Sequence, residues 1–262
     1  MQRDCYKVAI VGAGPAGLFA AHELVLNGER NVVIIDKGKD INKRKCPLQN
    51  YTKCLKCEPC NVLCGLGGAG GLSDGKLNLR ADIGGNLNEF TEDAQSLIEK
   101  IDKIFLKHGA SKKLYGKNLD ELEKIASQHG IRFIPIPQRH IGSDKLPSVI
   151  SSLRRELEEK GVRFLLEKEV KEIEKGERFS LIMKDEIIEA DYVIAAVGRS
   201  GAEWLSKQAE KLGIKTKHAP IDIGVRVEVP SVVMEDIIDL SLIHISEPTR
   251  PLYISYAVFC LK

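Results

Sequence analysis

The sequence predicts an α/β fold built on a mixed parallel β-sheet with helices on both faces. Three observations lead to this prediction: an apolar run that ends in glycines, a helical pattern directly after it, and a second apolar run that follows. A strand, a helix and a second strand in this order form a βαβ unit, whose two strands lie parallel. The 262 residues are enough to bury a substantial core in one large or two small domains.

The first βαβ unit occupies the beginning of the chain. A strand is expected over residues 6–11, a helix over 15–26 and a second strand over 32–35. Residues 37–85 then combine basic residues, cysteines and glycines with little periodicity, so they are expected to form a long, functional loop region.

Helices and short strands are expected to alternate in the rest of the chain. Apolar residues at steps of three and four predict helices over residues 86–108, 118–129, 147–160 and 202–212. Short apolar runs between charged turns predict strands over residues 131–136, 162–166, 170–173, 179–183, 187–188, 192–197 and 221–229.

The glycine-rich turn of the first βαβ unit is the sharpest chemical signal. In the run VAIVGAGPAG, Gly12 permits a tight turn, Gly14 lets the backbone approach a pyrophosphate, and Gly17 lets the helix pack closely on the strand. Pro15 suits the first helical turn, and Ala16 follows it where the N–H groups of a helix start favour a phosphate. These five residues are expected to bind a dinucleotide rather than to form a merely structural turn.

An acid at the end of the second strand completes the pattern. Asp36 lies 19 residues after Gly17, where it is expected to accept hydrogen bonds from the adenosine ribose. An Asp at a strand end is also common as a simple turn residue. Strand, glycines, helix, second strand and acid all agree, but the motif alone fits FAD and NAD(P) equally well.

These segments resemble the two-dinucleotide-binding flavoproteins. The resemblance is carried by the GAGPAGL turn, by the DKG that starts at Asp36, and by the later run ADYVIAAVGR. It implies FAD as the cofactor, with its adenosine diphosphate at the first motif. It also implies that Lys37, Gly198 and, through its main chain beside the adenine, Val170 belong to the binding site.

More closely, the chain resembles the bacterial FAD-dependent dehydrogenases of uncharacterised substrate. The runs that carry this resemblance are DKGKDINKRKCP, the cysteines from Cys54 to Cys64, GLGGAGGLSDGKL and PQRHIG, and it extends over about residues 6–239. It implies an FAD-dependent oxidoreductase with hydride or electron transfer through the flavin ring. Two alternatives stay open: an NAD(P)-dependent oxidoreductase that uses the same glycine turn, and a metal- or iron–sulfur-binding redox sensor in which a nucleotide only stabilises the fold.

The predicted fold class is accordingly an α/β Rossmann-like FAD/NAD(P)-binding fold with an inserted Cys/Gly-rich loop and an α+β insertion. The expected parts are residues 1–85 with the loop, the inserted segment 86–189, the returning part 190–239 and a non-native tail 240–262. The tail is expected because LSLIHISEPTR and ISYAVFCLK resemble the translation of a sequencing-library adapter. The native sequence is then expected to stop before the closing segment of the cofactor domain.

Four cysteines lie close together after the first βαβ unit. Cys54, Cys57, Cys60 and Cys64 have the C-x2-C-x2-C-x3-C spacing of a bacterial iron–sulfur run, with Cys46 upstream. Closely spaced thiolates also bind zinc, and a thiol/disulfide pair exchanges electrons with a flavin. The spacing therefore predicts an iron–sulfur cluster, a zinc ion or redox thiols, and it leaves structural cysteines as the alternative.

Further candidate residues lie in the glycine-rich loop and near the middle of the chain. Residues 65–75 hold six glycines and Ser73, and they are expected to face the cofactor rather than to form a flexible linker. Arg44 is expected either to pair with the pyrophosphate as a fork donor or to lie exposed. Arg139 and His140 are expected in a strand-end loop as catalytic candidates, His140 as a proton donor or acceptor or as a structural histidine.

Composition and charge give no general support for a nucleic-acid or membrane partner. The 39 Lys and Arg residues against 37 Asp and Glu give a formal net charge of +2, which provides no general electrostatic case for a nucleic-acid or anionic-membrane partner. The sequence shows neither a leader with a cleavage site nor an apolar run of about 18 residues. We therefore expect a soluble, cytoplasmic protein that acts on a small-molecule substrate or an electron carrier, in an oligomeric state that the sequence leaves open.

Overall fold

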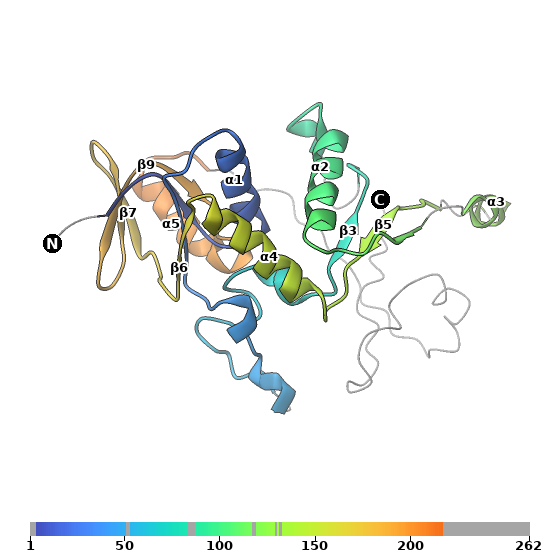
Figure 1. The fold of residues 1–262 in the computed structure, drawn as a ribbon, viewed down its shortest axis with the longest axis horizontal. Coiled ribbons are helices and arrows are strands. Elements are labelled where there is room, and N and C mark those ends of the chain that lie inside the picture. Colours follow the sequence, from blue (N-terminus) through green and yellow to red (C-terminus); the bar gives the residue numbers. More distant parts are fainter. Residues whose placement is uncertain are drawn as a thin grey trace.

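A computed structural model describes residues 4–50, 53–82, 87–116, 119–128, 130 and 133–216 (Figure 1). The strand expected over 221–229 and the tail expected from residue 240 lie outside the described residues. The expected non-native nature of that tail therefore stays a prediction.

A six-stranded sheet in the order β6-β2-β1-β9-β8-β7 forms the centre of the described structure. Its four parallel strands are β1 (Asp4–Val11), β2 (Val32–Asp36), β6 (Arg163–Leu166) and β9 (Ile187–Ala195). The antiparallel strands β8 (Phe179–Ile182) and β7 (Glu172–Lys175) extend it at one edge. The predicted mixed parallel sheet is confirmed.

Side chains of the central strands alternate between two hydrophobic clusters, one on each face of the sheet. In β2, Val32 and Ile34 belong to one cluster, while Val33 and Ile35 belong to the other. The first cluster includes residues of α1 (Pro15–Leu26) and α4 (Leu146–Glu159), and α5 (Ala202–Lys211) packs on the second (Figure 1). Helices thus cover both faces, as the sequence predicts.

A smaller, three-stranded antiparallel sheet lies apart from the main one (Figure 1). Its order is β3-β5-β4, formed by β3 (Lys76–Asn78), β5 (Gln138–His140) and β4 (Leu114–Tyr115). Helix α2 (Ala94–Lys107) lies beside this sheet, and α3 (Asp120–Gln128) projects away from the rest of the molecule (Figure 1).

Several expected elements are formed differently because strand pairing involves residues far apart in the chain. Residues 133–136 form no strand, and the strand begins only after Pro137, where β3 and β4 supply ladder partners. The two strands expected over 187–188 and 192–197 are one strand, β9, because β1 pairs with it over nearly its whole length. Helix α2 starts at Ala94, after a separate 3-10 turn at Leu87–Glu89.

The position of β6, β7 and β8 also changes the expected division of the chain. All three strands belong to the main sheet, although they lie within the expected inserted segment 86–189. The part that departs from the main sheet is therefore shorter than expected, and it consists mainly of the small sheet with α2 and α3.

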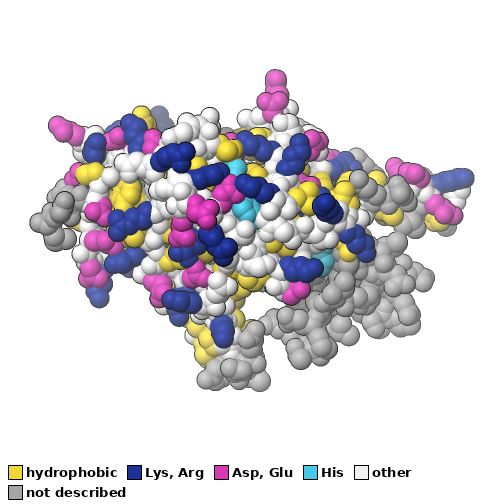
Figure 2. Space-filling model, viewed as in Figure 1, with side chains coloured by type: hydrophobic (Ala, Val, Ile, Leu, Met, Phe, Trp, Pro, Cys, Tyr) yellow, Lys and Arg dark blue, Asp and Glu magenta, His cyan; other side chains and the backbone are white. Residues whose placement is uncertain are grey.

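The surface agrees with the even charge balance of the sequence. Figure 2 shows Lys and Arg side chains interspersed with Asp and Glu over the visible face. Among the described helices, none is both long and apolar enough to cross a lipid bilayer.

Candidate functional site: a dinucleotide-binding cavity

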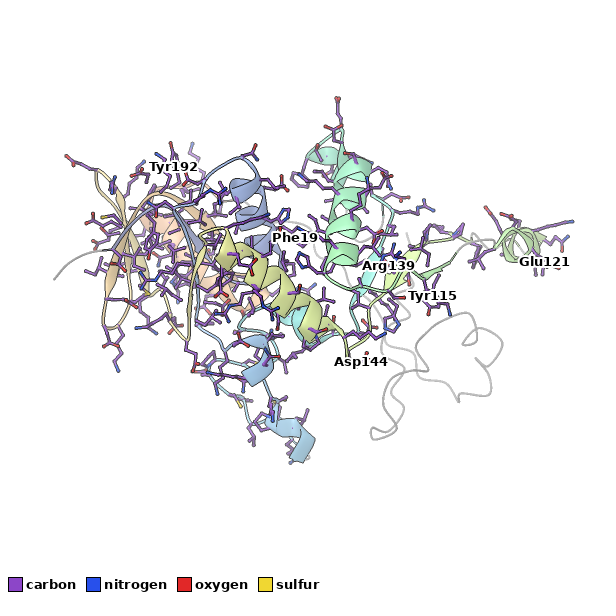
Figure 3. The ribbon with its side chains drawn as sticks, viewed as in Figure 1. Phe19, Tyr115, Glu121, Arg139, Asp144 and Tyr192 are labelled. Atoms are coloured by element: carbon purple, nitrogen blue, oxygen red, sulfur yellow. The ribbon has the colours of Figure 1, made fainter. Side chains whose placement is uncertain are left out.

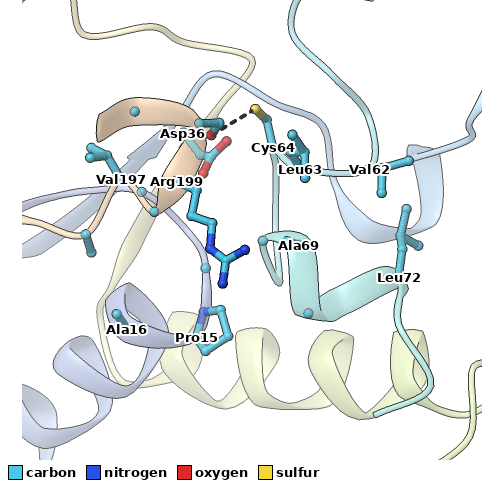
Figure 4. Close-up of a pocket in the computed structure, with 18 of the residues that line it drawn as sticks. Pro15, Ala16, Asp36, Val62, Leu63, Cys64, Ala69, Leu72, Val197 and Arg199 are labelled. Carbon is cyan, nitrogen blue, oxygen red and sulfur yellow. Dashed lines mark hydrogen bonds between the residues drawn. The ribbon is translucent and has the colours of Figure 1, made fainter. Parts of the chain in front are cut away.

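A cavity of about 1210 Å³ lies at the carboxyl ends of the parallel strands β1, β2 and β9. Ligands of open α/β sheets bind at this edge, outside the ends of the strands. The start of α1, the end of β2, the second glycine run and the segment after β9 form its walls (Figure 4). Because small-molecule sites usually measure about 300–1,000 Å³, the cavity has room for an extended ligand.

The glycine turn of the first βαβ unit has the backbone geometry that the motif predicts. Gly12 has φ +112°, and a side chain there would collide with the carbonyl group of Ala196. A side chain at Gly17 would collide with the carbonyl oxygen of Gly12, so α1 packs closely on β1 only because this position is glycine. Gly14 differs, since a Cβ atom there would meet nothing closer than Gly68 Cα at 3.7 Å.

Helix α1 begins at the wall of the cavity without a capping side chain from the described residues. Gly14 occupies the N-cap position, Pro15 the first helical turn, and that turn holds no acidic residue. Uncapped N–H groups at a helix start, together with the helix dipole, favour an anion. The backbone at Pro15, Ala16 and Gly17 is therefore suited to a phosphate, as expected from the sequence.

Asp36 lines the same cavity at the end of β2. Its carboxylate accepts hydrogen bonds from the backbone N–H groups of Ala13 (2.8 Å), Gly38 (2.7 Å) and Gly65 (2.8 Å). A carboxylate has about four acceptor positions, so about one stays available for a ribose hydroxyl. Asp36 thus joins three loops, in addition to the hydrogen bonds with the adenosine ribose that the motif predicts.

The second glycine run packs directly on the first. Gly67 N–H donates to the carbonyl oxygen of Ala13 at 2.8 Å, and Gly68, Gly70 and Ser73 line the cavity. Ser73 Oγ donates to the Gly70 carbonyl (2.7 Å), so this hydroxyl already has a partner within the loop. A cofactor-facing position for the loop agrees with the sequence prediction.

Arg44 has a different role from the expected phosphate contact. Its guanidinium donates to the carbonyl oxygens of Asn61 (2.8 Å), Val62 (2.7 Å) and Leu66 (2.7 Å), and only 4% of the residue is exposed. Burial lowers the pKa of this guanidinium. Loop carbonyls that lack a partner in a β-ladder need such donors, so Arg44 supports the cysteine and glycine loop. Arg44 does not line the cavity.

The remaining residues that line the cavity include some that the sequence predicts and some that it does not. Lys37, Val170 and Gly198 line the cavity, in agreement with the resemblance to flavoproteins. Arg199 and Trp204 line it too, although neither was assigned to the site from the sequence. The position of Arg199 directly after Gly198, at the end of the apolar run 192–197, was the available signal.

The end of the cavity nearest the small sheet contains ionisable side chains. His140 lies in β5 opposite Lys76 of β3, and both line the cavity together with Asp74. Lys76 Nζ lies 3.1 Å from Asp74 Oδ2, while His140 Nε2 is buried and has no hydrogen-bond partner among the described residues. His140 thus lies in a strand rather than in the expected loop, and it stays a catalytic candidate.

Arg139 does not line the cavity. It lies beside helix α2 (Figure 3) and pairs with Asp102 of that helix. Its guanidinium forms a two-point ion pair with Asp102, in which Nη2 and Oδ2 lie 2.7 Å apart, and it also donates to the carbonyl oxygen of Ser111. The hydrogen bond with Asp102 raises the pKa of Arg139. Arg139 thus joins α2 to the small sheet, and its contacts give no support to the expected catalytic role.

The four clustered cysteines do not form a common site. Cys54 is exposed and Cys64 is buried, with its Sγ 3.6 Å from Ser200 Oγ (Figure 4). Of the four, Cys64 is the one that lines the cavity. In the described part of the chain, no three His, Cys, Asp or Glu side chains are placed to hold a metal ion, so the expected four-thiolate set is not assembled.

Two family models match parts of the chain. The model of an FAD binding domain matches residues 5–50, which contain the glycine turn and Asp36. The model of the pyridine nucleotide-disulphide oxidoreductases matches residues 138–234, which contain β5 to α5. The fold is that of an FAD-binding oxidoreductase. The predicted Rossmann-like fold class is thereby confirmed.

Solved structures with a similar arrangement are distant from this chain. The glycine oxidase from Geobacillus kaustophilus has 17% sequence identity and a TM-score of 0.49, with 81% of this chain and 59% of that one covered. The glycine oxidase from Bacillus cereus has 14% identity and a TM-score of 0.48, with 77% and 58% covered. A mutant of NikD, an unusual amino acid oxidase essential for nikkomycin biosynthesis, has 14% identity and a TM-score of 0.46, with 80% and 54% covered.

The chain thus spans between half and three fifths of the length of these structures. At such identities they give no information on the substrate. A comparison with curated proteins gives no match.

Proposed function

We propose that this protein is an FAD-dependent oxidoreductase, a dehydrogenase that acts on a small-molecule substrate or an electron carrier. The observation that carries the proposal is one continuous cavity that connects the dinucleotide motif to the ionisable residues of the small sheet. When bound, the flavin supplies the hydride or electron transfer, while the protein supplies binding and orientation.

The two ends of the cavity suit the two halves of FAD. Val170 and Asp36 both line the cavity and are suited to contact the adenine and its ribose, and the start of α1 at Pro15 is suited to the pyrophosphate. At the other end, Lys76 and His140 are suited to binding the substrate beside the flavin and to moving a proton through the imidazole.

A pair of glycine variants tests the cofactor assignment. In Gly14→Ala the new methyl group meets no atom closer than 3.7 Å, so the fold is kept while the approach of the pyrophosphate to the backbone is obstructed. The loss of one charge-assisted N–H contact should weaken FAD binding about 10- to 150-fold. Gly176→Ala is the matched control, because its methyl group lies 3.5 Å from the Arg178 carbonyl oxygen in a turn outside the cavity.

Absorbance in the visible flavin bands of the full chain, purified with added FAD, measures the outcome. The wild-type and Gly176→Ala proteins should retain flavin, and Gly14→Ala should lose it on dilution. A wild-type protein that stays colourless but binds NAD or NADP would contradict the proposal and favour the NAD(P)-dependent alternative.

A nicotinamide cofactor as electron donor to the flavin is supported by the pyridine nucleotide-disulphide oxidoreductase model that matches residues 138–234. Anaerobic bleaching of the flavin band by NADH or NADPH would support this part of the proposal. A flavin band that neither reagent changes would count against it.

The cysteine segment needs a separate measurement, because the structure does not assemble its four thiols. Stoichiometric iron or zinc in the purified protein that is lost in Cys57→Ser would support a metal site there. Metal-free protein that retains flavin would contradict both the metal site and the redox-sensor alternative.

A further inference from the structure

We infer that Arg199 is the side chain that binds the pyrophosphate of the dinucleotide, the role that the sequence suggested for Arg44. The inference rests on the proposed FAD site. Arg199 lines the cavity together with Gly14, Pro15 and Ala16, whereas Arg44 lies outside the lining.

The guanidinium of Arg199 is available for a ligand. In the part of the chain that the structure describes, its side chain forms neither an ion pair nor a hydrogen bond. Figure 4 shows it reaching from the end of β9 across the cavity toward Pro15 and Ala69. The lysines that line the cavity each lie near a carboxylate: Lys37 Nζ is 3.9 Å from Glu169, Lys168 Nζ is 2.9 Å from Glu186 and Lys76 Nζ is 3.1 Å from Asp74.

The backbone before Arg199 fixes the position from which this side chain extends. Ala196 N–H donates to the carbonyl oxygen of Val11 at 2.8 Å, so the end of β9 is held beside the glycine turn. Gly198 has φ +61°, a conformation that favours glycine, and it turns the chain into the short helix Arg199–Gly201. The guanidinium therefore starts from a fixed point opposite the start of α1.

The negative charge of a pyrophosphate favours a cation at this place. The start of a helix supplies only about half an elementary charge, and Asp36 adds a negative charge to the same wall. A guanidinium is planar and donates two parallel hydrogen bonds to phosphate oxygens, which a lysine does not do. Arg199 meets this requirement, since its donors have no other partner among the described residues.

Binding of ADP and of adenosine to the full chain, measured by calorimetry, tests the inference, because the two probes differ by the pyrophosphate. Arg199→Gln should weaken ADP binding about 10- to 150-fold and leave adenosine binding unchanged. Arg199→Lys should recover only part of the loss, because the ammonium lacks the two-point geometry. Arg155→Gln is the matched control, since Arg155 is exposed on α4 and does not line the cavity.

Two results would overturn the inference. In the first, the Arg199→Gln variant binds ADP as tightly as the wild type. In the second, the substitution weakens the binding of ADP and of adenosine by the same factor. Neither affects the proposed function, which fails only if the wild type takes up no FAD. If ADP binding depends on Arg199 although FAD is not taken up, the pyrophosphate contact stands and the flavin assignment falls. A thermal midpoint of Arg199→Gln equal to that of the wild type shows that the fold is intact.

Discussion

Replacing Asp36 by Asn should destabilise the protein even when no nucleotide is present. The Asp36 carboxylate accepts three backbone hydrogen bonds, from Ala13, Gly38 and Gly65, and so joins the first glycine turn, the end of β2 and the second glycine run. An amide has only one oxygen. Whichever way it turns, at least one of the three N–H donors faces the NH2 group instead of an acceptor.

The expected magnitude follows from the loss of one hydrogen bond to a charged group. Such bonds contribute about 1.5–3 kcal/mol. Among the described residues, the three N–H groups donate to no acceptor other than Asp36. For a chain of this size, the loss corresponds to a decrease of about 3–12 °C in the thermal midpoint. The ribose plays no part in this loss, because the nucleotide is absent.

Urea and thermal unfolding of the nucleotide-free full chain measure the effect. Asp185→Asn is the matched control, since Asp185 lies exposed in the turn between β8 and β9 and should leave the midpoint unchanged. If Asp36→Asn unfolds at the same urea concentration as the wild type, the three-loop role of Asp36 is refuted. An effect of Asp36→Asn seen only after FAD is added would mean that the acid acts through the ribose alone.

Three further predictions concern stability. Burial by itself would raise the pKa of Glu156, but hydrogen bonds and charges from Lys107 and Lys160 lower it to about 2. The ionised form therefore stabilises the fold above pH 4.5, by at most about 3 kcal/mol, and this contribution is lost as the pH falls toward 2. Urea unfolding of Glu156→Gln should lack this part of the pH dependence, and an unchanged dependence would contradict it. Arg139→Leu should cost about 3–5 kcal/mol, because it leaves the Asp102 carboxylate, 14% exposed, without its partner. The double variant with Asp102→Leu should recover most of that loss in the same assay, and no recovery would count against the ion pair as the cause. Leu157→Ala should cost about 2–5 kcal/mol in urea unfolding, since Leu157 is fully buried under the sheet. The control Ile125→Ala, at a residue that is 46% exposed on α3, should change the free energy of unfolding little. Equal effects of the two substitutions would show that the burial of Leu157 is not the cause of the loss.

Local patterns predicted the nucleotide-binding half of the fold well. The helix expected over residues 15–26 is α1 with the same bounds, and the strands expected around it are β1 and β2. Here each signal occupies only a few consecutive residues: alternating burial along β2, a proline in the first turn of α1, and glycines that avoid a collision with backbone. Such signals are visible in the sequence because a short, continuous segment contains each of them, even where the atoms that impose the constraint come from elsewhere in the chain.

The small sheet could not be predicted in the same way. Its strands have two or three residues each, and β5 is a strand only because β3 and β4 reach it from distant parts of the chain. Residues 133–136 are apolar enough for a strand, but they pair with no strand in the part of the chain that the structure describes. A short run therefore becomes a strand when a neighbour supplies ladder hydrogen bonds, and the periodicity of the run does not contain that information.

The sequence was sufficient for the dinucleotide turn, for the acid after β2 and for the α/β class, because these depend on backbone geometry that a short motif specifies. Only the tertiary structure decided which charged side chains face the cavity. Arg44 binds loop carbonyls, Arg139 binds Asp102, and Arg199 is left without a partner among the described residues. The partner of a long side chain depends on which distant segments fold next to it, and the sequence pattern around the residue does not contain that information.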